Sequence, residues 1–156
     1  MVVRKDEHLA RLMQIITSVP FIGFITATYI IICTNEFKDI TDPKKFACYA
    51  GIAPFPKESG LVVRKWRTSH LANKKMKSLL HICAVGAIAR NEELKVYFNR
   101  KVKEGKPKRL IINAVRYKLI LRVFACLKQD RLFIKEFQCL ESFHSKDITN
   151  REPLAT

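Results

Sequence analysis

Apolar residues recur at the spacing of an α-helix over most of this 156-residue chain, and no segment sustains the alternation of a β-strand. The helical patterns cover residues 6–17, 24–34, 43–50, 69–90, 92–103 and 108–128. We therefore predict an all-α fold, a compact helical domain over residues 1–135. Beyond residue 131 the pattern loses its period, so we expect residues 136–156 to form a frayed tail.

Several of these helices have recognisable starting residues. Asp42 is placed as the N-cap of a helix whose first residue is Pro43, Asn91 can cap the helix over residues 92–103, and Ser69 can cap the long helix that ends at residue 90. In the last helix we expect Leu110, Ala114, Tyr117, Leu121 and Phe124 on one apolar face, with further apolar residues that widen the stripe and place the helix at the centre of the core. Arg116 and Arg122 in that helix then need an outlet to solvent or to phosphate.

A Pro/Gly turn over residues 18–23 joins the first two helices. Together they predict an element that resembles a helix-hairpin-helix, over about residues 7–34. In that motif the turn presents backbone N–H groups at a helix N-terminus to a DNA phosphate, and here Gly23 would occupy that place. The usual turn has glycine where this chain has Phe21, so a turn that only packs two helices is the alternative.

The charge of the chain is far from balanced. Lys and Arg number 29 against 14 Asp and Glu, which gives a net charge of +15 and a pI near 9.9. Such an excess indicates a polyanionic partner, most commonly nucleic acid. A membrane surface is the competing polyanion, but no run of about 18 apolar residues exists. The polar N-terminus does not resemble a signal peptide, and we predict a cytoplasmic protein without a membrane partner.

The cysteines and histidines do not predict a metal site. The five cysteines fall singly within apolar patterns, without a Cys-x-x-Cys pair and without histidine at zinc-ligand spacing. We expect the cysteines to be reduced core residues, and we expect this chain itself to bind no metal or cofactor.

The loop over residues 51–68 is the main candidate functional segment. It is too rich in Pro and Gly to be helical, and such loops often carry function. Ser59 stands within it, next to Gly60, and could attack a phosphodiester. The nearby residues that could neutralise a phosphate are Lys57, Arg64, Lys65 and Arg67. The alternative is an ordinary basic turn, because no Gly-x-Ser-x-Gly elbow or Ser-His-Asp triad is recognisable in the sequence.

A cationic stripe follows the loop. His70, Lys74, Lys77 and His81 stand at helical spacing, so they fall on one face of the predicted helix over residues 69–90. The alternative is a solvated helix face. We favour phosphate contact, because the basic loop extends the same run of cations.

Several blocks occur in an order and spacing that are specific together. They are residues 16–27 (ITSVPFIGFITA), 46–54 (FACYAGIAP), Ser59-Gly60 with the basic linker to Ser69, Asn73-Lys74, 91–94 (NEEL) and Gly105-Lys106. With these blocks, residues 15–128 resemble the C-terminal domain of the insertion-sequence one-ten family of transposases. That family also includes the Piv-like DNA invertases and the bridge-RNA-guided recombinases.

This resemblance implies that Ser59 matches the family's serine nucleophile, which forms a covalent phosphoserine link to a DNA strand. It also implies a homo-oligomer and a structured guide RNA as partners, besides DNA. Members of the family carry an N-terminal RuvC-like domain with a four-carboxylate metal site, so Mg²⁺ is expected only through that domain. The chain starts just ahead of the first hairpin, which leads us to expect a truncated element, a gene remnant or half of a split transposase.

Three classes of function stay open from the sequence. The chain can be the DNA-binding, serine-bearing domain of a recombinase, inactive without its RuvC-like domain. It can be a passive nucleic-acid-binding domain, which requires only the cationic stripe. It can also be a helical interaction module that is merely basic.

Overall fold

The computed structural model describes residues 6–53, 58–59, 62–63 and 72–134. Its helices are α1 (Glu7–Ser18), α2 (Phe24–Thr34), α3 (Pro43–Tyr49), α4 (Lys74–Arg90), α5 (Glu92–Lys103) and α6 (Lys108–Lys128). Two strands of two residues each, β1 (Glu58–Ser59) and β2 (Val62–Val63), pair antiparallel. The predicted all-α class is confirmed, since this short ladder is the only strand pairing in the described residues.

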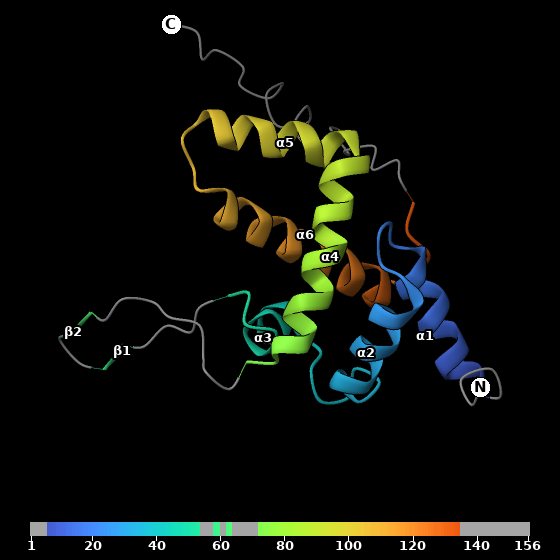
Figure 1. Ribbon diagram of the computed structural model, residues 1–156. Coiled ribbons are helices and arrows are strands. Elements are labelled where there is room, and N and C mark those ends of the chain that lie inside the picture. The colour runs from blue at the N-terminus through green and yellow to red at the C-terminus, as the bar shows by residue number, and fades with distance from the viewer. Residues whose placement is uncertain (1–5, 54–57, 60–61, 64–71, 135–156) are drawn as a thin grey trace, which may run out of the picture.

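Helix α6 lies at the centre of the fold and crosses α4 (Figure 1). It also packs against α1, α3 and α5, while α2 packs between α1 and α4. The main core joins the first half of the chain to the end of α6, with Ile16, Phe46, Leu80 and Val123 among its buried members. A second cluster lies where α4, α5 and α6 meet. The N-terminal helix pair is therefore held to the rest of the domain mainly through α4 and α6.

Side-chain caps start four of the helices where an Asx residue precedes them. Asp42 accepts a hydrogen bond from the Lys44 backbone N–H at 3.0 Å, and Asn91 accepts one from Leu94 at 3.1 Å, so both predicted caps are confirmed. Asp6 caps α1 in the same way. Each cap satisfies an N–H group that has no partner within its helix.

The predicted start of α4 at Ser69 is wrong. Asn73 is the N-cap, and its side chain accepts a hydrogen bond from the Met76 N–H at 2.9 Å. The backbone of Asn73 is extended, with φ −68° and ψ 99°, because its own N–H is bonded to the Tyr49 carbonyl. A helix cannot pass through a residue in that conformation, so α4 begins at Lys74.

The predicted buried face of α6 is also wrong in part. Leu110 is 63% exposed and Leu121 is 39% exposed. The buried row is instead Ile111, Val115, Leu119 and Val123. Apolar residues occur on every side of α6, interspersed with cations, and contacts with helices on several sides select the row that is covered.

The segment between α3 and α4 is closed at its base. The Asn73 N–H donates to the Tyr49 carbonyl at 2.9 Å, and the Asn73 Nδ2 donates to the Tyr49 hydroxyl at 2.9 Å. Gly51 has a φ of +65°, and a Cβ at this position would lie 2.7 Å from the Ala72 Cβ. The residues at the two ends of the segment are therefore packed tightly enough to require glycine.

This packing predicts the effect of Gly51→Ala. Gly105→Ala is the matched control, because Gly105 has a φ of +76° but nothing within 4 Å of the added Cβ. We expect the control to cost about 1 kcal/mol of unfolding free energy from backbone strain. Gly51→Ala should cost about 2–4 kcal/mol, because the clash with Ala72 adds to that strain. Urea unfolding of both variants measures the difference, and equal costs would show that the ends of the segment are not in contact.

Candidate nucleic-acid interface

The N-terminal part of α4 is cationic. Lys74 and Lys75 are exposed and Lys77 is half-buried. Among the described residues, none of these three lysines forms an ion pair with a carboxylate. The Lys75 ammonium instead lies 5.3 Å from the centroid of the Tyr29 ring. Their charge is thus available to an outside anion.

A chain of hydrogen bonds connects the base of the basic loop to α4 through α6. Asn113 Nδ2 donates to the Ile52 carbonyl at 2.5 Å, and Asn113 Oδ1 accepts from Arg116 Nη1 at 3.2 Å. Arg116 Nη2 lies 2.6 Å from His81 Nδ1. A guanidinium has no acceptor, so His81 Nδ1 must accept, which places the imidazole proton on Nε2. His81, which the sequence assigned to an outward stripe, is therefore a half-buried partner of Arg116.

Arg116 is incompletely satisfied in this arrangement. Its Nε is enclosed and has no hydrogen-bond partner among the described residues. Burial lowers the pKa of the Arg116 guanidinium from its ordinary value, because the protein desolvates the charge. No carboxylate in the described part of the chain pairs with Arg116. Within the described structure, Arg116 is thus a partly buried cation without a counter-charge.

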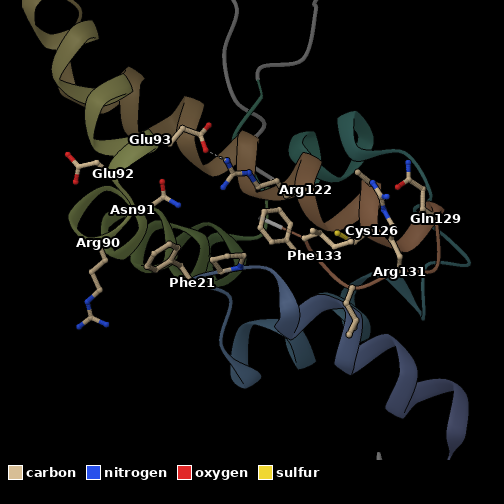
Figure 2. A pocket seen from close by; sticks show the side chains of 14 residues that line it. Phe21, Arg90, Asn91, Glu92, Glu93, Arg122, Cys126, Gln129, Arg131 and Phe133 are labelled. Carbon is tan, nitrogen blue, oxygen red and sulfur yellow. Dashed lines mark hydrogen bonds and ion pairs between the residues drawn. The ribbon is translucent and has the colours of Figure 1, made fainter. Parts of the chain in front are cut away.

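Arg122, the other arginine of α6, is placed differently. Its Nη2 lies 3.0 Å from Glu93 Oε2, and its guanidinium lies 5.6 Å from the centroid of the Phe133 ring. Figure 2 shows this ion pair at the edge of a pocket of about 640 Å³ between the start of α5, α6 and the turn after α1. The sequence showed only that both arginines need an outlet, and the structure gives Arg122 a carboxylate and Arg116 none.

Phe21 lines the same pocket and has a φ of +71°, a left-handed conformation that favours glycine (Figure 2). This is the position at which the usual hairpin turn has glycine. The N-cap of α2 is Gly23, which is exposed and offers no side-chain hydrogen bond to the helix. Phe24 and Ile25 beside it are 63% and 72% exposed. The turn can accept either an anion or an apolar partner, and its phosphate-binding role stays a prediction.

The structure does not bring all the predicted site residues together. Lys57, Gly60, Arg64, Lys65 and Arg67 lie outside the described residues. Ser59 is described by its backbone, which pairs with Val62 across the ladder. Figure 1 shows β1 and β2 set apart from the helices. Ser59 therefore does not lie against Lys74 and Lys77, which are on α4.

Neither a metal site nor a membrane span is evident in the described residues. No three His, Cys, Asp or Glu side chains there gather to hold a metal ion. The described residues therefore provide no site for the Mg²⁺ that the family resemblance assigns to a separate domain. None of the described helices is both long and apolar enough to cross a membrane.

Comparison with known proteins agrees with the order of the sequence blocks. A family model described as Transposase IS116/IS110/IS902 family matches residues 13–99, which is more than half of the chain. The chain belongs to this transposase family. The family match includes Ser59, Lys74, Lys77 and His81, and it ends before Arg116.

The relatives that match this chain are much longer than it is. The pilin gene-inverting protein of Moraxella bovis is 28% identical over 124 residues, which are 78% of this chain and 38% of that protein. The insertion element IS110 uncharacterized 43.6 kDa protein of Streptomyces coelicolor is 22% identical over 122 residues, which are 78% of this chain and 30% of that protein. The chain therefore spans less than half the length of these relatives.

The hydrogen bonds of Asn73 predict how firmly the base of the serine-bearing loop is held. Tyr49→Phe removes the hydroxyl that accepts from Asn73 Nδ2 and that also contacts Cys33, and should cost about 1 kcal/mol of unfolding free energy. Asn73→Ala removes that bond and the cap of α4, and should cost about 2 kcal/mol. Asn91→Ala, which removes a cap alone, is the control and should cost about 1 kcal/mol. If Asn73→Ala cost no more than Asn91→Ala in urea unfolding, the contact with Tyr49 would not stabilise the loop base.

Proposed function

We propose that this chain is the DNA-binding, serine-bearing part of a transposase or recombinase, and that it acts on DNA in the cytoplasm. The observation that supports this most is a family match that spans both the serine loop and a face of α4 with unpaired lysines in the described structure. A relative named for inverting a pilin gene acts on DNA by that name. A net charge of +15 gives this chain the electrostatic character for the same partner.

DNA binding would begin at the start of α4. Lys74 and Lys77 lie on one face near the N-terminus of this helix, where the helix dipole also favours an anion. Lys57, Gly60, Arg64, Lys65 and Arg67 would extend the surface along the loop, and Gly23 would present the N-terminus of α2 to another phosphate. Such contacts to phosphates fix position on the duplex without reading its sequence.

The proposed chemistry is transfer of a DNA phosphoryl group to Ser59. The Ser59 hydroxyl loses its proton and its oxygen forms a bond to phosphorus. One P–O bond to a deoxyribose oxygen breaks, and that oxygen takes up a proton to become a hydroxyl. The number of phosphate ester bonds does not change, so the step needs no oxidant or reductant. Cations beside the phosphate would stabilise its equatorial oxygens.

The rest of the machinery would come from other protein and RNA. We propose that a RuvC-like domain supplies the carboxylates and Mg²⁺, that a structured guide RNA selects the site, and that the assembled protein is a homo-oligomer. The second candidate function is passive nucleic-acid binding without catalysis. The separation of β1 from the helices favours this second candidate, because the lysines of α4 then do not lie beside Ser59.

The DNA-binding part of the proposal predicts a steep dependence of affinity on salt. For a duplex DNA, log K should fall with log salt by roughly 0.9 for each phosphate contacted. The double variant Lys74→Ala/Lys77→Ala should reduce that slope by roughly 0.9 to 1.8, because one or two phosphate contacts are lost. The control double variant Lys38→Ala/Lys101→Ala removes the same charge from lysines that are paired with Glu36 and Glu104. A slope that both double variants lower equally would mean that α4 makes no special contact.

The catalytic part predicts a covalent link at Ser59. With a RuvC-like domain, Mg²⁺, guide RNA and matching DNA supplied in trans, wild-type protein should form a protein–DNA adduct, and Ser59→Ala should abolish it. Ser78→Ala is the control, because Ser78 is exposed on α4 and should not affect the adduct. Binding should survive Ser59→Ala, which removes no charge. Denaturing gels and mass spectrometry measure the adduct, and one that maps to another residue would disprove the assignment.

A further inference from the structure

Hydrogen bonds connect Arg116 to the base of the basic loop. Its guanidinium is bonded to Asn113, whose Nδ2 is bonded in turn to the Ile52 carbonyl at the start of that loop. On the other side, its Nη2 is bonded to His81 of α4. These contacts orient the guanidinium from two helices and connect it, through Asn113, to the start of the segment that carries Ser59.

Lys77 adds a second cation at the same place. It stands one helical turn before His81 on α4, so the two side chains share a face. Its Nζ lies 4.0 Å from the position of a Cβ added to Gly51, the residue before Ile52. Lys77 therefore reaches the base of the loop from α4, and Arg116 is connected to it from α6 through Asn113.

The charges at this place are not compensated by the described residues. Among the described residues, neither Lys77 nor Arg116 has a carboxylate partner, and the Arg116 Nε has no hydrogen-bond partner. Arg122 provides the contrast, because an anion would have to compete with Glu93 for it. An anion that approaches Arg116 breaks no ion pair, and it satisfies a cation that burial has partly desolvated.

We propose that Arg116 and Lys77, oriented by His81 and Asn113, bind one phosphate of the nucleic-acid backbone at the base of the loop that carries Ser59. The guanidinium keeps N–H groups beyond its two hydrogen bonds, and its planar fork matches the two non-bridging oxygens of a phosphodiester. The site rests on the proposed nucleic-acid binding and specifies where one contact is made. Because Asn113 connects Arg116 to Ile52, Arg116 is a positioning residue that sets the loop relative to the bound strand.

The test compares Arg116→Gln with Arg122→Gln in the whole chain, using a duplex DNA over a range of salt concentrations. Each variant removes one positive charge from α6. Arg116→Gln should lower the slope of log K against log salt by roughly 0.9 and weaken binding about tenfold at 0.1 M salt. Arg122→Gln should leave the slope at the wild-type value. If wild-type protein bound without salt dependence, the proposed function would fail. If it bound with a steep slope that Arg116→Gln did not change, only the phosphate site would fail.

A second measurement observes binding in the wild-type chain itself. The side-chain Nε–Hε signal of Arg116 can be observed by NMR in the wild-type chain and assigned by its loss in Arg116→Lys. It should shift when the duplex is added, because the environment of the enclosed Nε changes when the guanidinium binds phosphate. A signal that stays in place while backbone signals of α4 shift would overturn the proposal. A shift produced by a poly-glutamate peptide and not by DNA would overturn it in favour of an acidic protein partner.

Discussion

The contact between Tyr49 and Asn73 holds together the two ends of the segment between α3 and α4. One backbone and one side-chain hydrogen bond, both 2.9 Å long, join the end of α3 to the residue that caps α4. Asn73 thus closes the segment and starts the helix in the same place. The close approach of Gly51 to Ala72 requires that closure. Because short contacts hold this base, the start of α4 and the first residues of the loop are fixed relative to each other.

Local signals predicted most of the helices, and contacts from distant residues explain the errors. Asp42 and Asn91 act on their own helices, so a capping pattern in the sequence was enough to find them. Ser69 has the same capping chemistry, but α4 starts four residues later because Tyr49 holds Asn73 in an extended conformation. In α6, periodicity could not choose among several apolar rows. Packing chose the row through Val115 and left Leu110 exposed.

The sequence predicted that the candidate site carries an excess of cations, but it did not predict how their side chains are arranged in space. An excess of cations and the spacing of Lys74 and Lys77 follow from the sequence alone. The partnership of Arg116 with His81 does not, because it joins residues that are 35 positions apart on two helices. Two arginines six positions apart on one helix looked equivalent in the sequence. One has Glu93 as a partner and the other has a histidine, and only the second is left without a counter-charge in the described structure.

The two-stranded ladder that carries Ser59 lies apart from the helices that carry Lys74, Lys77 and Arg116. A phosphoryl group under attack needs positive charge close to its oxygens, since electrostatic interactions weaken with distance and with salt. Ser59 lies on a ladder apart from α4 and α6, so the lysines there would hold the strand without stabilising the reacting phosphate. The charge at the reacting phosphate must then come from the loop's own arginines and lysines or from another domain. On this view, loss of α4 cations and loss of Ser59 impair different steps. Arg116 connects them, because it belongs to the helical body and its hydrogen-bond partner Asn113 contacts the loop base.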